Sequence, residues 1–246
     1  WAQTDTTATE HAQHEAFNLM TPRSSCPHCG TPIKWFHNIP LLSYVALQGK
    51  CAHCGTRVSL QYPLVEALTA LLFAACAHFF DWPFAALAWS GFCAVLLAAA
   101  LIDWKTTYLP DLLTLPLMWA GILCALLGWI QLPLAQSVWG AIIGYSTLWT
   151  IYWVFKLLTG KDGMGYGDFK LLAALGAWMG PIALIPILLI SCTMGSAFGL
   201  LQRLRGTLLA GQAFAFGPFL AAAGFSMCFW GRSRSEEHTS ELQSHH

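Results

Sequence analysis

Long apolar runs separated by short polar turns occupy most of the chain after Leu60. Two of these turns are Asp81-Trp82-Pro83 and Gln131-Leu132-Pro133. The first four runs predict helices over about 62–80, 84–102, 112–130 and 134–155. Each of them is about long enough to cross a hydrocarbon core of about 30 Å, so the pattern predicts membrane-spanning helices.

The apolar pattern resumes after a polar loop from Lys156 to Asp168. The run from Leu171 to Leu201 is too long for one span, and Gly180-Pro181 inside it predicts a short fifth helix and a full sixth. A seventh helix is expected over about 214–230, with its start kinked or delayed by Phe-Gly-Pro at 216–218. The predicted fold class is an all-α, polytopic membrane helical bundle of about seven helices.

Composition agrees with this pattern. The chain is 56% hydrophobic and only 10% charged, with a mean hydropathy of +0.54. Soluble domains have about 25% charged residues, so a soluble domain with a large core is excluded. The net charge of zero says nothing about nucleic acid, but no basic stretch that would bind it is present. From the apolar composition we expect membrane lipid, and not nucleic acid, around this chain.

The two ends of the chain differ from its apolar middle. Residues 1–25 are polar and predict a solvated lead-in, without the charged and apolar segments of a secretory signal. The first residue is Trp and not Met, so we expect a fragment or a processed product. Residues 234–246 resemble the translation of a sequencing-adapter oligonucleotide followed by one extra His, and we exclude them as an artefact tail.

Two CxHCG segments predict a metal site near the beginning of the chain. They supply Cys26, Cys29, Cys51 and Cys54, with 21 residues between Cys29 and Cys51. This spacing is typical of a structural four-cysteine zinc site, and iron would fit the same shell. Two disulfides or a redox CxxC remain alternatives. Because four thiolates complete the shell, His28, His37 and His53 are expected to be surface residues. We therefore expect a zinc-knuckle domain over 26–61 and a membrane domain over 62–231.

The five other cysteines lie singly in apolar runs and are expected to be small buried hydrophobic residues. They are Cys76, Cys93, Cys124, Cys192 and Cys228. Paired thiols that bind a metal fit a reducing compartment better than an oxidising one.

Charge bias predicts how the helices are oriented. Alternating the helices places residues 1–61, 103–111, 156–170 and 202–213 on one face. That face holds ten Lys and Arg residues, whereas the other face holds none before Arg232. Positive residues favour the cytoplasmic side, so we expect the knuckle, Asp103 and Asp168 to lie there.

Acidic residues are rare in the membrane domain. Between Trp82 and Gln202 they are Asp103, Asp111, Asp162 and Asp168. Asp103 ends an apolar helix, where a negative charge is disfavoured, and Asp168 begins an apolar run. Two carboxylates that meet and share a proton can activate a water molecule. The alternative is structural, with each Asp at a helix cap or at the interface, and Asp168 as the cap of the following helix.

Other residues of these loops have structural explanations. Pro110 suits the first turn of the third helix or its approach, and Asp111 then suits the positive end of that helix. Gly165 and Gly167 allow the backbone to bend close to Asp168 and to an extended substrate strand. A single GxGD is a weak signal, but here it directly starts a membrane segment.

Taken together, the motifs resemble the type IV prepilin peptidase family, bacterial membrane aspartic proteases of the GxGD class. The resemblance covers roughly residues 18–231. The matching stretches are CPHCG, CAHCG, the WFHNIPLLSY spacer, Gly49-Lys50, RVSLQYPLVE, IDWKTTYLPD, GMGYGDFKLL and AFGPFLAAAG.

The resemblance implies that Asp103 and Asp168 are the catalytic pair. One would hold a water as general base while the other, protonated, polarises the scissile carbonyl. Their neighbours in the same motifs are expected to support them: Gly165, Gly167, Pro110, Asp111 and Lys170.

The resemblance also implies an activity and partners. The family cuts the short basic leader from prepilins and pseudopilins of type IV pilus and type II secretion systems, at the cytoplasmic face of the inner membrane. Many members then methylate the new N-terminal amine with S-adenosylmethionine, and the zinc-bearing loop is expected to serve that step.

Two departures from the family pattern accompany this resemblance. The family begins with a membrane helix carrying a GSFLNV-type motif, which this sequence lacks, so we expect the first family helix to be missing. No glycine-rich Rossmann signature is present, so no residue is assigned to S-adenosylmethionine.

Three functions remain open from the sequence. The first is a peptidase with methyltransferase activity, and the second is a peptidase without it. The third is a zinc-knuckle membrane scaffold or a small transporter, although a transporter should carry charges near the midplane and none is predicted there. The sequence does not indicate an oligomeric state.

Overall fold

The computed structural model describes residues 25–26, 28–33, 42–160, 164–206 and 215–229. These residues form helices and two isolated β-bridges, but no strand, which confirms the all-α prediction. The chain divides into two compact units, Trp1–Ala70 and Leu71–His246. The polar lead-in and the excluded tail lie outside the described residues, as do His37 and Asp162.

The first unit contains the two cysteine segments, the short helix α1 (Leu42–Ala46) and the first part of α2 (Gln61–Phe79). Tyr44 of α1 packs against Gly49, where a Cβ would stand 2.7 Å from the Tyr44 hydroxyl. The same hydroxyl donates a hydrogen bond to the carbonyl of Val58 over 3.3 Å. Gly49 has φ of 67°, so the absence of a side chain serves both the turn and the packing.

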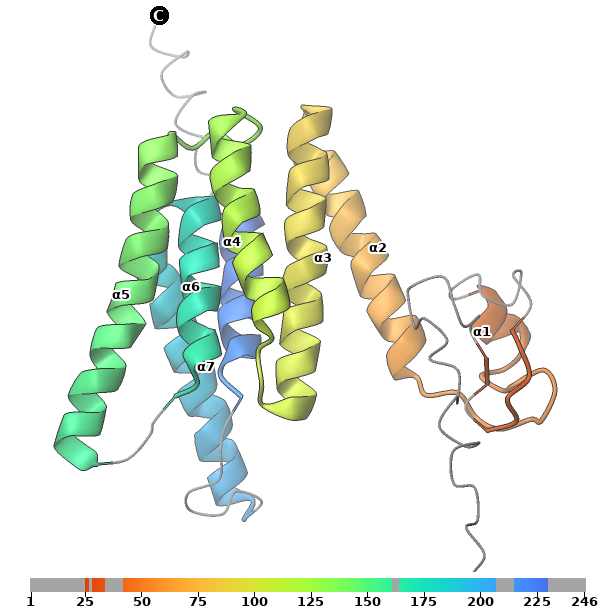
Figure 1. Cartoon of the computed structure of the whole chain (residues 1–246). Helices are drawn as coiled ribbons and strands as arrows, with labels where there is room; N and C mark the ends of the chain where they lie inside the picture. The colour runs from red at the N-terminus through yellow and green to blue at the C-terminus, as the bar shows by residue number, and fades with distance from the viewer. Residues whose placement is uncertain (1–24, 27, 34–41, 161–163, 207–214, 230–246) are drawn as a thin grey trace, which may run out of the picture. The chain divides into compact units, whose positions relative to one another are not determined.

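The second unit is a helical bundle (Figure 1). Its named helices are α3 (Pro83–Thr106), α4 (Asp111–Leu126), α5 (Leu134–Thr159), α6 (Tyr166–Met179) and α7 (Leu184–Leu204). A further helix, Gly217–Phe229, follows. With α2, these elements make the seven helices that the apolar runs predict. Phe-Gly-Pro marks the start of the last one, as expected.

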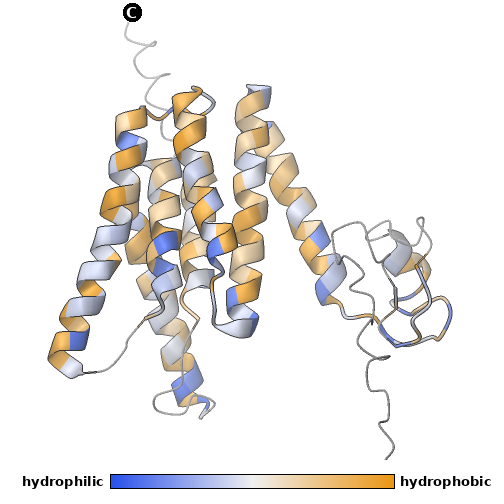
Figure 2. Cartoon of the chain, in the orientation of Figure 1, coloured by the Kyte–Doolittle hydropathy of each residue, from blue (hydrophilic) through white to orange (hydrophobic). Residues whose placement is uncertain are grey.

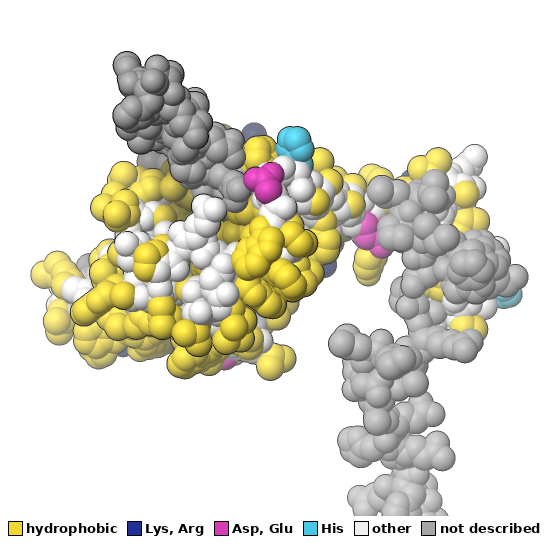
Figure 3. Space-filling view, turned by 90° about the horizontal axis from the view of Figure 1, so that it is seen from above, with side chains coloured by type: hydrophobic (Ala, Val, Ile, Leu, Met, Phe, Trp, Pro, Cys, Tyr) yellow, Lys and Arg dark blue, Asp and Glu magenta, His cyan; other side chains and the backbone are white. Residues whose placement is uncertain are grey.

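Among the described residues, four helices are long and apolar enough to cross a membrane: α2, α3, α5 and α7. Hydrophobic residues are frequent along these helices (Figure 2), and many of their large hydrophobic side chains are exposed. Hydrophobic side chains also cover much of the end of the bundle in Figure 3. A helix that is hydrophobic all round is typical of a membrane span.

Helix α6 is the buried helix of the bundle. Ten of its fourteen residues are buried, including Asp168 near its start and Trp178 near its end. In Figure 1 it lies behind and between α4 and α5, which contact it along their length. The helix that carries Asp168 is therefore held by protein on most sides.

Small residues allow α5 and α6 to approach closely. A Cβ on Gly140 of α5 would collide with the backbone of Gly176 of α6, and one on Gly144 would lie 2.6 Å from the Leu172 carbonyl oxygen. Ser137 of α5 also donates to the carbonyl of Ala177 over 2.6 Å. Glycines four apart are the usual signal for close helix packing in membranes.

Trp178 binds α6 to α4 on the side away from α5. Its indole N–H donates to the carbonyl of Leu117 over 2.8 Å. A Cβ on Gly121 would lie 2.6 Å from the Trp178 ring, so glycine makes room for the indole. The position of α6 is thus fixed from both neighbouring helices.

Helix α4 is shorter than predicted, because it ends at Leu126 and not near Ile130. Gly128 adopts φ of 69°, and the backbone N–H of Trp129 donates to the Cys124 carbonyl over 2.8 Å. This is a Schellman ending, in which a left-handed glycine closes the helix. The apolar residues after it continue the hydrophobic run without continuing the helix.

The prediction of five buried cysteines was wrong for Cys192. It is exposed on α7, whereas Cys76, Cys93, Cys124 and Cys228 are buried. The buried residues of α7 include Ile187, Ser191 and Gly195, which form one stripe at helical spacing. Cys192 lies about 100° around the helix from Ser191, outside that stripe.

Candidate active site

Asp103 lies in the last turn of α3 and is only 4% exposed. Its carboxylate accepts a hydrogen bond from the backbone N–H of Gly217 over 3.0 Å. Gly217 is the first residue of the Gly217–Phe229 helix, whose N-terminal end is electropositive. The charge that is disfavoured at the end of its own helix is therefore stabilised by the beginning of another.

Asp168 is buried at 6% exposure in the first turn of α6. The alternative that it caps this helix is not supported, because Gly165 is the N-cap and the Asp168 N–H donates to the Gly165 carbonyl over 3.2 Å. The carboxylate turns back toward the backbone of Gly165, where a Cβ would stand 3.8 Å from its Oδ2. Asp168 thus also lies at the electropositive end of a helix.

The structure brings these two acids together. The two carboxylates lie near enough to interact electrostatically, although 65 positions separate them in the sequence. Leu109 lies against both segments that hold them. A Cβ on Gly167 would be 2.5 Å from Leu109 Cβ, and one on Gly217 would be 2.9 Å from Leu109 Cδ1.

Two residues of this arrangement were missed in the sequence. Gly217 lies in the AFGPFLAAAG stretch and Leu109 in the IDWKTTYLPD stretch, but the sequence predicts only a kinked or delayed helix start for the first and no role in the site for the second. Gly217 stands in the Phe-Gly-Pro stretch at the start of a helix, and such a start exposes backbone N–H groups to an acid. Leu109 directly precedes Pro110 and carries no comparable signal, since one leucine among many predicts only burial.

The supporting residues lie at the starts of two helices. Pro110 and Asp111 are at the start of α4, and Lys170 is near the start of α6. Pro110 is the N-cap of α4 and Asp111 is its first residue, as predicted. Lys170 Nζ lies 2.6 Å from each of the two carboxylate oxygens of Asp111. The two motif segments are therefore joined by an ion pair as well as by Leu109.

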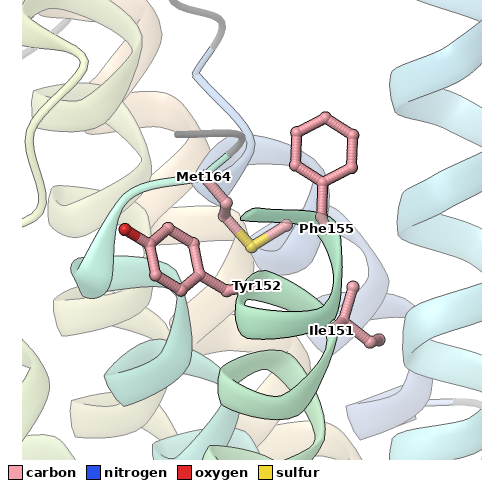
Figure 4. Close-up of a pocket in the computed structure, with 4 residues that line it drawn as sticks. All are labelled: Ile151, Tyr152, Phe155 and Met164. Carbon is pink, nitrogen blue, oxygen red and sulfur yellow. The ribbon is translucent and has the colours of Figure 1, made fainter. Parts of the chain in front are cut away.

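A cavity of about 160 Å³ lies on another side of the Asp168 segment, lined by Ile151, Tyr152, Phe155 and Met164. Met164 reaches toward the three α5 residues (Figure 4). The Tyr152 ring packs against Tyr166 and Phe169, with centroids 5.4 and 5.6 Å apart. Neither acid lines this apolar space, so it offers no carboxylate for hydrolysis.

The four-cysteine site forms as predicted. The Sγ atoms of Cys26, Cys29, Cys51 and Cys54 all lie within 4.8 Å of one another. Cys26 and Cys54 are 3.9 Å apart, close to the about 3.8 Å that tetrahedral zinc with Zn–S bonds of about 2.3 Å requires. The residues therefore fit zinc. His28 and His53 are exposed, as expected.

The two cysteine segments repeat one backbone arrangement. Cys26 N–H donates to the Thr31 carbonyl and Cys51 N–H to the Thr56 carbonyl, over 3.0 and 2.8 Å. Each threonine hydroxyl also contacts a thiol, at 3.3 Å for Cys29 and 3.2 Å for Cys54. These hydroxyls lower the pKa of Cys29 and lower that of Cys54 to about 6, because a hydroxyl can donate to a thiolate. Thiolates are the form that binds a metal.

Comparison with known proteins places this arrangement in a family. A protein of Burkholderia pseudomallei is 50% identical over 215 residues, which cover 87% of this chain and 69% of that protein. Its counterpart in Aeromonas hydrophila is 49% identical over 224 residues, covering 91% and 77%. One of Neisseria gonorrhoeae is 46% identical over 213 residues, covering 87% and 73%. All three are named prepilin leader peptidase/N-methyltransferase.

The chain belongs to the type IV leader peptidase family. The family's own sequence pattern matches residues 90–200, and the bacterial peptidase A24 N-terminal domain matches residues 7–80. The leader peptidase match contains both Asp103 and Asp168, and the N-terminal match contains all four cysteines of the metal site. No solved structure matches the chain.

Family membership excludes one of the three functions left open by the sequence. It excludes the scaffold and the transporter as the function of this chain, and together with the four apolar helices it identifies a multi-pass protein of the inner membrane.

Proposed function

We propose that Asp103 and Asp168 are the catalytic pair of a membrane endopeptidase that removes the leader from prepilins or pseudopilins. The observation that carries this proposal is that two buried carboxylates from distant motifs are held by segments that both lie against Leu109. Asp103 accepts a hydrogen bond from the electropositive start of a helix, which supports the ionised form of that acid. Family membership supports the leader peptide as the substrate.

In this mechanism the two acids divide the proton transfers between them. The Gly217 N–H favours the charged form of Asp103, which takes a proton from the attacking water as general base. Asp168, protonated, donates to the scissile carbonyl oxygen as the water oxygen bonds to its carbon. When the tetrahedral intermediate breaks down, the leaving nitrogen receives the proton that Asp103 accepted, and Asp168 takes back a proton from one hydroxyl of the intermediate. One water is consumed, and a carboxylic acid and a free amine are released.

The new amine is the proposed substrate of a second reaction. The relatives are named leader peptidase and N-methyltransferase, which supports methyl transfer from S-adenosylmethionine to the mature terminus. Zinc held by the four cysteines would fix the fold of the knuckle, since all four ligand positions are taken by thiolates. We assign the methyl transfer to no side chain.

The proposed location of both reactions is the cytoplasmic face. The segments that adjoin the acids carry Lys105, Lys156 and Lys170, whereas the Asp81-Trp82-Pro83 and Gln131-Leu132-Pro133 turns carry no Lys or Arg. This distribution supports the orientation expected from the positive-inside rule.

Replacing either acid tests the proposal. Asp103→Asn and Asp168→Asn keep the side-chain shape but remove the ionisable group, so each is expected to abolish cleavage of a prepilin in detergent, measured as loss of the leader on a gel. Asp81→Asn is the matched control, because it makes the same change in the α2–α3 turn. Cleavage by either active-site variant, with membrane insertion unchanged, would contradict the assignment.

A further inference from the structure

An ion pair joins the two segments that carry the candidate acids. Lys170 Nζ contacts both oxygens of Asp111 at 2.6 Å. Lys170 follows Asp168 by two positions on α6, and Asp111 begins α4 at the end of the segment that follows Asp103. The pair therefore connects the start of α4 to the start of α6.

Leu109 lies next to this connection. A single residue, Pro110, separates it from Asp111, and the backbone there has φ of −70° and ψ of 134°. The proline ring fixes φ, so the position of Asp111 strongly restricts the position of Leu109. Leu109 is 4% exposed and fits between Gly167 and Gly217. Gly167 directly precedes Asp168, and the Gly217 N–H donates to Asp103. Leu109 therefore lies between the segments that position the two acids.

Neither helix propensity nor a contribution to stability explains why Asp111 and Lys170 form this ion pair. Lys170 lies near the N-terminus of α6, where the helix dipole disfavours a cation. The side chains of Lys170 and Asp111 are 25% and 53% exposed, and exposed ion pairs add little to stability. What the pair does fix is the position of the segment that contains Leu109.

We propose that Asp111 and Lys170 are positioning residues, which hold Leu109 between Gly167 and Gly217 and thereby set the spacing of Asp103 and Asp168. This inference rests on the proposed function, in which both carboxylates act on one water. Without the pair, the start of α4 can shift relative to α6, and the carboxylates lose the spacing that the reaction needs. The effect falls on kcat, because neither residue is assigned to substrate binding.

Charge exchange tests this role in the full-length chain. Asp111→Asn and Lys170→Met are each expected to lower kcat about ten- to hundredfold, with KM changed less than about twofold. The double exchange, Asp111→Lys with Lys170→Asp, is expected to restore most of kcat. Arg203→Met, at the end of α7, is the control for loss of one exposed cation.

Two results of this experiment would overturn the inference. In the first, the single variants unfold at a lower temperature but keep a normal kcat per folded molecule. A purely structural ion pair would give this result. The other is a loss of kcat that the double exchange does not restore.

A second measurement reports the spacing without using activity. In a chain with Asp103→Cys and Asp168→Cys, thiol-specific linkers of graded length report the separation of the two positions, and mass spectrometry identifies the linked peptides. Adding Lys170→Met is expected to shift linking toward longer linkers, whereas adding Arg203→Met leaves it unchanged. An unchanged linker profile would overturn the inference even if the peptidase assignment held. Cleavage by Asp103→Asn would overturn that assignment, while the linker profile would still decide on the spacing.

Discussion

At the scale of single residues, the candidate site depends on glycines that touch it. Gly217 supplies the N–H that binds Asp103, and a Cβ at that position would lie 2.7 Å from Asp103 Oδ2. Gly167 leaves room for Leu109 in the same way. The absence of side chains at these positions is therefore as much a part of the site as the two carboxylates.

Gly217→Ala is expected to displace the Asp103 carboxylate and to lower kcat about a hundredfold, because misplacement by about 1 Å has effects of this size. The chain should still insert and fold. Steady-state cleavage of a prepilin measures the effect. Gly91→Ala, in α3, is the control, since nothing lies within 4 Å of the added methyl group. Normal cleavage by Gly217→Ala would show that the space left by glycine does not determine the position of the Asp103 carboxylate.

At the scale of elements, two kinds of contact position α6. Backbone contact through Gly140, Gly144 and Gly176 sets its distance from α5, and the Trp178–Leu117 hydrogen bond sets its position against α4. Since α6 carries Asp168 in its first turn, these distant contacts determine where that carboxylate lies.

Gly140→Ala is expected to force α5 and α6 apart and to lower the free energy of unfolding by about 1–3 kcal/mol, as overpacking does. Thermal unfolding in detergent would show this as a lower midpoint. The matched variant is Gly199→Ala in α7, where the methyl group meets no atom within 4 Å and the midpoint should stay the same or rise. Equal midpoints for the two variants would mean that the glycine contact does not limit the α5–α6 distance.

The apolar runs predicted the number of helices and most of their bounds, because a helix that spans a bilayer needs a long apolar run. It placed the end of α4 too late, since the Schellman ending depends on Gly128 and not on polarity. The two acids could be predicted because charge is rare in such runs. Their contacts with Gly217 and Leu109 could not, because these join residues as much as 114 positions apart.

At the scale of the whole molecule, the chain combines a thiol-rich unit with a helical one. The four cysteines lie within Trp1–Ala70, and both acids lie within Leu71–His246. The first unit is expected to need a metal for its fold, since a small knuckle has little apolar core of its own. The second has a large core formed by its helices.

Removing zinc is therefore expected to separate the two reactions. A chelator, or Cys29→Ser, should release the metal and abolish methylation of the mature terminus, while leader cleavage continues. Zinc analysis and mass spectrometry of the pilin product measure both effects, and Cys192→Ser is the control because Cys192 lies outside the site. Cleavage that falls in parallel with zinc content would contradict this division.

The most direct test of the account is the separation of the Asp103 and Asp168 carboxylates in an experimental structure of the active chain in a lipid bilayer. We predict that the nearest carboxylate oxygens of the two acids lie within about 6 Å of each other, the range over which neighbouring charges act strongly. We also expect one water between the two carboxylates and a hydrogen bond from the Gly217 N–H to Asp103. Carboxylates that face away from each other at a greater distance, in a chain that still cleaves prepilins, would contradict it.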